Sequence, residues 1–212
     1  MLVLPGFARP VDRLARTAEA SGFKCCAVAA WLVLHAPLAA PAQVTVHVEP
    51  RGDGVQIEAT AVLRADAGTA WSVLTDYDGY ERFIPGVQSS RVLERRGAHV
   101  TVRQFTEAAL WLFRKPMTIT YDIIEDAPRG LTSRVVAGCE CALESAYVLD
   151  PAQDGVRLAY TGHFVAAADL RGALETAAGE QQIARHLQAL VDEIERKAAA
   201  QSADTRAVPA AR

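Results

Sequence analysis

The chain has 212 residues, half of them hydrophobic, which suits one domain with a substantial core. Its net charge of −3 and pI near 6.0 leave it without the dense basic surface that phosphate backbones require, so nucleic acid is not an expected partner. The sequence contains no glycine-rich phosphate loop and no zinc-type Cys/His spacing, so we expect neither a cofactor nor a metal.

Residues 1–42 have the features of a secretory signal peptide. Basic residues precede the apolar run Cys25–Leu34, and Ala40-Pro41-Ala42 offers small residues for cleavage before Gln43. An uncleaved membrane anchor is the alternative, although the run is shorter than the roughly 18 residues that a spanning helix needs. We therefore expect an exported protein, periplasmic or secreted.

Residues 43–54 form a leader with an edge strand. Gln43–Pro50 alternates between apolar and polar residues, and a turn follows at residues 51–54. Val55–Arg64 repeats this alternation, which predicts a strand with one apolar face.

Two short helices are expected next. Asp66 can cap a helix over Ala67–Leu74, and a second helix over Tyr80–Ile84 ends at Pro85-Gly86. This segment gathers four aromatic residues at one corner, namely Trp71, Tyr77, Tyr80 and Phe83.

Six further strands are expected, separated by turns such as Arg96-Gly97 and Pro128-Arg129-Gly130. Short turns make consecutive strands antiparallel neighbours. The predicted strands are Val87–Arg95, Ala98–Ala109, Pro116–Asp126, Leu131–Ala137, Ala142–Asp150 and Gly155–Val165.

The last element is a helix from Asp169 to about Ala200, with a broad apolar stripe at helical spacing. Gly172 and Gly179 weaken its first half and predict a bend there. We expect residues 201–212 to form a disordered tail.

The pattern Ala70-Trp71-x-Val73-Leu74-Thr75-Asp76-Tyr77, followed by Tyr80-x-x-Phe83-Ile84-Pro85, resembles the START-like (SRPBCC) superfamily. The resemblance is to its polyketide cyclase/dehydrase and coenzyme-Q-binding branch, and it extends over residues 55–197 or so. It implies an α+β helix-grip domain over residues 55–200, with a curved antiparallel sheet of about seven strands around the long C-terminal helix. Two short helices would follow the first strand, and a ligand cavity would lie between the sheet, the long helix and the aromatic corner.

The ligand-binding candidates are aromatic and polar residues that this arrangement would bring to the cavity. Tyr121, Tyr147 and Tyr160 lie on the inward phases of three strands, and Phe164 shares the phase of Tyr160. Gln104 interrupts a strand that leads into the apolar run around Trp111. The full set is Trp71, Tyr77, Tyr80, Phe83, Gln104, Trp111, Tyr121, Tyr147, Tyr160 and Phe164.

No catalytic residue is predicted. The histidines are expected at the surface or at strand ends, with His186 at the surface of the terminal helix beside Arg185. Cys139 and Cys141 are expected as two small apolar strand residues, with a metal half-site or redox pair as the alternative.

These observations favour a non-enzymatic carrier for an apolar small molecule. The resemblance implies a lipid, quinone or polyketide-like ligand, which a carrier would exchange during transient contact with a membrane. An aromatic cyclase or dehydratase using the same cavity is the alternative, with Gln104, Tyr121 and Tyr160 as its polar groups. A partner-binding module is a third hypothesis, and the oligomeric state is left open.

Overall fold

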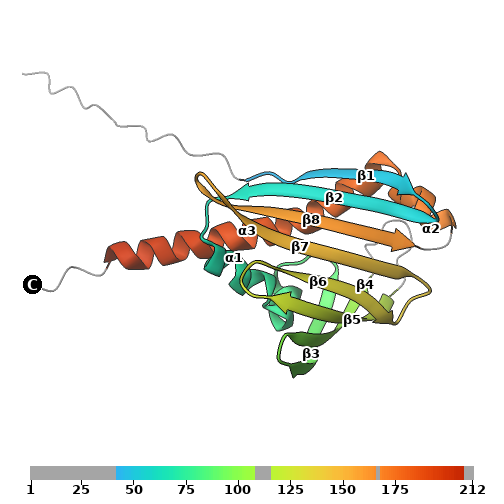
Figure 1. The fold of residues 1–212 in the computed structure, drawn as a ribbon, viewed down its shortest axis with the longest axis horizontal. Helices are drawn as coiled ribbons and strands as arrows, with labels where there is room; N and C mark the ends of the chain where they lie inside the picture. Colours follow the sequence, from blue (N-terminus) through green and yellow to red (C-terminus); the bar gives the residue numbers. More distant parts are fainter. Residues whose placement is uncertain (1–41, 108–115, 166–167, 208–212) are drawn as a thin grey trace, which may run out of the picture. The chain divides into compact units, whose positions relative to one another are not determined.

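The computed structural model describes residues 42–107, 116–165 and 168–207 (Figure 1). The strands are β1 (Thr45–Arg51), β2 (Gly54–Leu63), β3 (Val87–Arg96), β4 (His99–Glu107), β5 (Pro116–Asp126), β6 (Gly130–Ala137), β7 (Ala142–Ala152) and β8 (Gly155–Val165). The helices are α1 (Ala67–Leu74), the 3-10 helix η1 (Tyr77–Arg82), α2 (Ala168–Leu174) and α3 (Ala177–Ala207).

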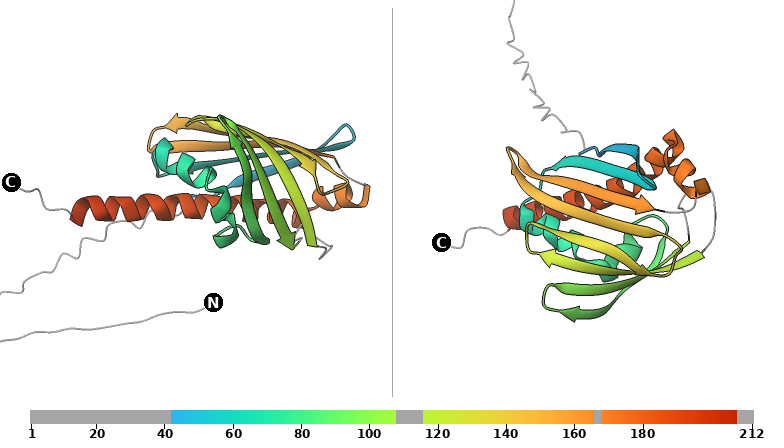
Figure 2. Two further views of the ribbon diagram at one scale, coloured as in Figure 1. Left: turned by 90° about the horizontal axis from the view of Figure 1, so that it is seen from below. Right: turned by 45° about the vertical axis from the view of Figure 1, so that its right-hand side comes forward.

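The strands form one antiparallel sheet in the order β1-β2-β8-β7-β6-β5-β4-β3, with α3 lying along one face (Figure 2). This is the predicted helix-grip architecture. The sheet has eight strands rather than about seven, because the leader strand β1 pairs with β2 at the edge.

The corner between β2 and β3 is fixed by polar contacts. The Asp66 carboxylate accepts hydrogen bonds from the hydroxyl and the backbone N–H of Thr69, at 2.6 and 2.9 Å, and these bonds lower its pKa. The buried Tyr77 hydroxyl donates to Glu125 of β5 at 2.9 Å, and Arg95 of β3 pairs with the same carboxylate at 2.8 Å. Together these contacts hold η1 against β3 and β5.

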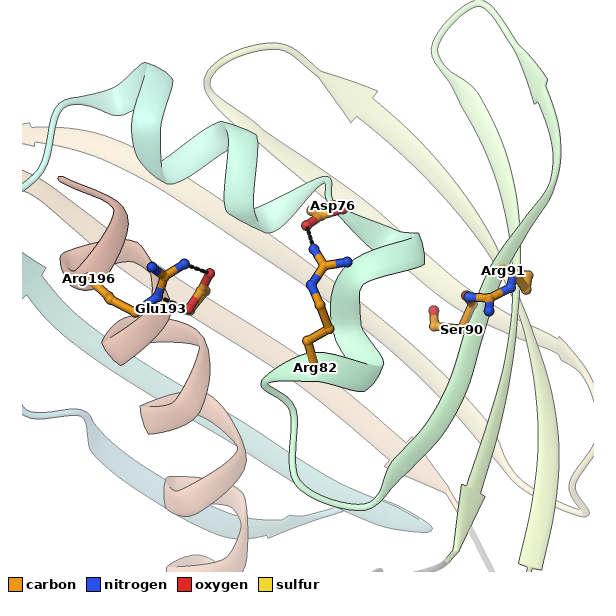
Figure 3. A network of polar contacts seen from close by, with 6 residues as sticks. All are labelled: Asp76, Arg82, Ser90, Arg91, Glu193 and Arg196. Carbon is orange, nitrogen blue, oxygen red and sulfur yellow. Dashed lines mark hydrogen bonds and ion pairs between the residues drawn. The ribbon is translucent and has the colours of Figure 1, made fainter. Parts of the chain in front are cut away.

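Charged pairs lie where η1 faces α3 (Figure 3). Arg82 pairs with Asp76 at 2.6 Å, and Arg196 pairs with Glu193 at 2.6 Å. The hydrogen bond from Arg196, with Arg82 also nearby, lowers the pKa of Glu193. These partly exposed pairs add little stability individually, but they keep charge outside the helix–sheet interface.

The C-terminal segment is divided into α2 and α3, which confirms the bend predicted near Gly172 and Gly179. The Thr176 hydroxyl accepts a hydrogen bond from the Gly179 N–H at 3.1 Å, which satisfies one of the unpaired donors in the first turn of α3. α3 continues to Ala207, so residues 201–207 are helical and the predicted end near Ala200 is too early.

The positions of Cys139 and Cys141 differ from the prediction that both are strand residues. β6 ends at Ala137 and β7 begins at Ala142, so both cysteines lie in the connecting turn rather than in a strand. They form a disulfide with a Cα–Cα distance of 5.2 Å, shorter than the roughly 6.5 Å between alternate residues of an extended strand. Gly138 has a positive φ of 108° and provides the reversal that brings them together.

Candidate ligand cavity

A cavity of about 260 Å³ lies between the inner face of the sheet and the helices η1, α2 and α3. The sheet contributes residues from β2 to β8, while α3 contributes Gln182, Ile183, His186 and Leu187. The helical segment before β3 contributes Tyr77 and Tyr80. The cavity therefore lies between the three regions named by the sequence resemblance.

Most of the predicted ligand-binding residues line this cavity. The alternation of β5, β7 and β8 turns Tyr121, Tyr147 and Tyr160 toward α3, as their strand phases predicted. The other predicted residues in the lining are Tyr77, Tyr80, Gln104 and Phe164.

Two of the described predicted residues do not line it. Trp71 is half-buried against the main hydrophobic core, and so is Phe83, whose ring packs edge-to-face on Tyr80 at 5.5 Å between centroids. Their position on the two short helices brings them to the corner but directs them to the core, which strand-like alternation could not have indicated. Trp111 lies outside the described residues.

A chain of hydroxyl groups crosses three strands on the cavity wall. The Ser133 and Ser145 hydroxyls are 2.8 Å apart, and Ser145 also hydrogen-bonds to the Tyr160 hydroxyl. Burial raises the pKa of Tyr160 to about 12, while the bond to Ser145 acts in the opposite direction. Gly162 makes room for this ring, because a Cβ there would lie 2.6 Å from the Tyr160 hydroxyl oxygen.

Two other tyrosine hydroxyls at the cavity have protein partners. Tyr80 donates to the Leu74 carbonyl oxygen at 2.6 Å, and Tyr77 is held by Glu125. Burial raises the pKa of both phenols. These two residues therefore contribute ring surface to the cavity, while their hydroxyl groups are already used in the fold.

Tyr121 and Tyr147 differ, since no described residue hydrogen-bonds to either hydroxyl. The Tyr147 ring packs on Tyr160 with centroids 4.8 Å apart, and electrostatic coupling among the three phenols places them in one neighbourhood. Burial raises the pKa of both groups, so both hydroxyls remain protonated and can donate.

His186 of α3 is exposed, as the sequence analysis expected, but it also lines the cavity, which the sequence analysis did not predict. Desolvation by the surrounding protein lowers the pKa of its imidazole to about 4. A signal was present: His186 is three residues after Ile183 and four before Leu190, so it shares their helix face.

No lysine, arginine, aspartate or glutamate is among the described lining residues. The side-chain amide of Gln104 donates to the buried Ser90 hydroxyl at 3.3 Å, which orients the amide on the wall. Within the described ranges, no group of three or more His, Cys, Asp or Glu residues could hold a metal ion. The wall is thus apolar with a few uncharged polar groups, which is typical of small-molecule sites.

A larger hollow of about 1390 Å³ lies beside the last turns of α3. It is open to solvent and bordered by charged residues, including Arg64, Asp66, Asp126 and Arg129. Because an apolar ligand there would remain in contact with water and ionic groups, the smaller cavity is the better candidate site.

Comparisons with known proteins identify relatives of this fold. The family profile described as polyketide cyclase / dehydrase and lipid transport matches residues 54–199. No curated protein sequence matches the chain.

Several solved structures are similar. The Zhui aromatase/cyclase from Streptomyces sp. R1128 is 23% identical, with a TM-score of 0.57, and the alignment covers 71% of this chain and 96% of that protein. A STAR-related lipid transfer protein from Xanthomonas axonopodis is 18% identical with a TM-score of 0.53, covering 75% of this chain and 96% of its own. A START superfamily protein from Mycobacterium smegmatis is 14% identical with a TM-score of 0.54, covering 69% and 98%. At these identities the likeness shows the shared fold.

Proposed function

Since the chain belongs to the polyketide cyclase/dehydrase and lipid transport family, we propose that it is a carrier that holds an apolar small molecule in the 260 Å³ cavity. The observation that carries the proposal is the uncharged wall of that cavity, which offers apolar surface and a few hydrogen-bonding groups. A lipid, quinone or polyketide-like compound fits this chemistry. Such a ligand gains free energy of roughly 25 cal/mol for each Å² of apolar surface removed from water.

The protonation states of the cavity groups support binding over acid–base catalysis. A general acid or base works best when its pKa is near the operating pH. The pKa of His186 is lowered to about 4 and that of Tyr160 is raised to about 12, both far from neutrality. A cyclase or dehydratase using Gln104, Tyr121 and Tyr160 is the competing function. It predicts that Tyr121→Phe and Tyr160→Phe change turnover of a substrate, whereas a carrier predicts that they change only affinity.

The test is native mass spectrometry of the full chain purified from its own host, followed by organic extraction of the bound material. We expect a stoichiometric apolar compound that is released chemically unchanged. Val135→Phe should abolish its retention because this side chain lines the cavity. Val136→Phe is the matched control, since the neighbouring side chain is 50% exposed on the other face.

A protein that retains and takes up no apolar compound would contradict the carrier proposal. A compound that is converted to a new product by the parent, and not by Tyr121→Phe, would favour the enzyme.

We also propose that the chain is exported. The basic lead-in and apolar run before Gln43 support this, and so does the Cys139–Cys141 disulfide, since disulfides persist mainly in oxidising compartments. Within the part of the chain that the structure describes, no helix is long and apolar enough to cross a membrane. Cell fractionation and amino-terminal sequencing test the proposal: we expect a periplasmic or secreted product that starts at Gln43. Recovery of the intact chain in the cytoplasm would overturn it, and recovery in the membrane fraction would favour an anchor.

A further inference from the structure

Three polar groups at the cavity have no partner among the described residues, namely the Tyr121 and Tyr147 hydroxyls and the His186 imidazole. The two hydroxyls come from the sheet, whereas the imidazole comes from α3 on the opposite wall. A buried polar group without a hydrogen bond costs about 1–3 kcal/mol. The neighbouring polar groups of the same wall, Tyr160 and Gln104, do have partners.

The chemistry of these groups restricts what they can bind. Both hydroxyls can donate a hydrogen bond, and a neutral imidazole can donate from one nitrogen and accept at the other. Since no described lining residue is charged, the described part of the wall would not neutralise a carboxylate, sulfonate or ammonium group. A hydroxyl or carbonyl oxygen on an otherwise apolar molecule can form hydrogen bonds with these groups and carries no charge.

The volume restricts the size of the enclosed part. A cavity of about 150 Å³ encloses benzene. The cavity here, at about 260 Å³, has less than twice that volume and corresponds to a molecule of about two fused rings.

We propose that the enclosed portion of the ligand is a neutral, two-ring-sized group bearing a hydroxyl or carbonyl oxygen, bound between His186 and the hydroxyls of Tyr121 and Tyr147. This inference rests on the carrier function proposed above and narrows its ligand class. The rings contact the apolar wall around Ile119 and Leu187, and the oxygen completes the hydrogen bonds that the fold leaves unmade.

The experiment measures the affinity of the full chain, after extraction of any bound compound, for three probes of one shape at pH 7. 2-Naphthol carries a neutral hydroxyl, 2-methylnaphthalene carries no polar group, and 2-naphthoate carries a negative charge. We expect 2-naphthol to bind about fivefold more tightly than 2-methylnaphthalene, as one or two hydrogen bonds would give. 2-Naphthoate should bind at least about a hundredfold more weakly than 2-naphthol, because its charge would be buried without a partner.

Variants assign the preference to the three groups. In Tyr121→Phe, Tyr147→Phe and His186→Leu, the ratio of 2-naphthol to 2-methylnaphthalene affinity should fall toward one, with the affinity for 2-methylnaphthalene retained. His99→Leu is the control, since this histidine is exposed and is not among the residues that line the cavity. This control should keep the parent ratio.

Equal affinity for 2-naphthol and 2-methylnaphthalene would overturn the inference, as would a ratio that the three variants leave unchanged or tight binding of 2-naphthoate. In each of these cases an apolar ligand still binds, so the carrier function stands. Failure of all three probes to bind would also overturn the inference on size, while the co-purified ligand would decide the carrier function separately.

Discussion

Two segments of α3, its middle and its N-terminal segment, face the same sheet but pack differently. In the middle, Leu190, Val191 and Ile194 are at most 2% exposed and pack in the main core with Leu63 and Leu74. In the N-terminal segment, Ile183 and Leu187 are buried in a second hydrophobic cluster and also border the cavity.

The sheet residues opposite each segment explain why only the N-terminal segment borders a cavity. Branched aliphatic side chains from β2, β4 and β8 fill the space opposite Val191 and Ile194, as a close-packed interior requires. At the cavity that Ile183 borders, the sheet presents tyrosine rings, of which Tyr147 and Tyr160 contact each other at a tilt. Packing apolar helix residues against hydroxyls that have no hydrogen-bond partner costs free energy. The N-terminal segment of α3 therefore leaves a cavity that can take a ligand.

The strongest test of this contrast uses the same substitution in the two segments of the helix. Ile194→Ala should lower the free energy of unfolding by about 4 kcal/mol, since it removes a completely buried side chain from a packed core. Ile183→Ala should cost only about 2 kcal/mol, because part of its side chain already faces empty space. Urea denaturation of both variants measures the difference in the free energy of unfolding. Equal losses would show that the two segments are packed alike.

Removing hydroxyl groups separates partnered from unpartnered tyrosines. Tyr77→Phe should destabilise the fold by about 2 kcal/mol, because it removes a buried hydrogen bond to the Glu125 carboxylate. Tyr121→Phe should change stability by no more than about 0.5 kcal/mol and in the stabilising direction, since its hydroxyl has no partner to lose among the residues that the structure describes. Thermal melting of the ligand-free variants gives both values. A loss of 2 kcal/mol in Tyr121→Phe would mean that its hydroxyl is used in the fold.

A methyl group at Gly162 should distort the cavity wall. Gly162→Ala places a Cβ against the Tyr160 hydroxyl, so the ring must shift; we expect a loss of about 1 kcal/mol and weaker ligand binding. Gly172→Ala is the matched control. Its added Cβ meets nothing within 4 Å in helix α2, and it should stabilise the protein by about 0.5 kcal/mol. Unchanged ligand affinity in Gly162→Ala would show that the Tyr160 ring does not shape the site.

A separate test is a dependence of stability on pH that comes from His186. Its pKa is about 4 in the folded protein, below the value of roughly 6.5 for an unfolded histidine, so protonation favours the unfolded chain. The stabilising contribution is complete above pH 6.5 and is lost as the pH falls toward 4. The melting temperature of the parent should therefore fall more steeply over this interval than that of His186→Gln, with His99→Gln following the parent. Parallel curves for the parent and His186→Gln would place the imidazole in bulk solvent.

The sequence alone determined the elements and their order. Period-two alternation predicted the strands, short turns made neighbours antiparallel, and one long apolar stripe required a sheet face to cover. The same alternation placed Tyr121, Tyr147 and Tyr160 on the cavity side, because side-chain direction along a strand follows from the backbone alone.

The tertiary structure decided the features that the local sequence patterns did not specify. The disulfide between Cys139 and Cys141 depends on the conformation of the turn between β6 and β7, which strand alternation does not specify. His186 shares the helix face of Ile183 and Leu190, but only the unfilled space opposite it determines whether the imidazole meets solvent, a packed core or a cavity. A hollow arises where facing side chains fail to fill a volume, and that volume is set by the whole fold.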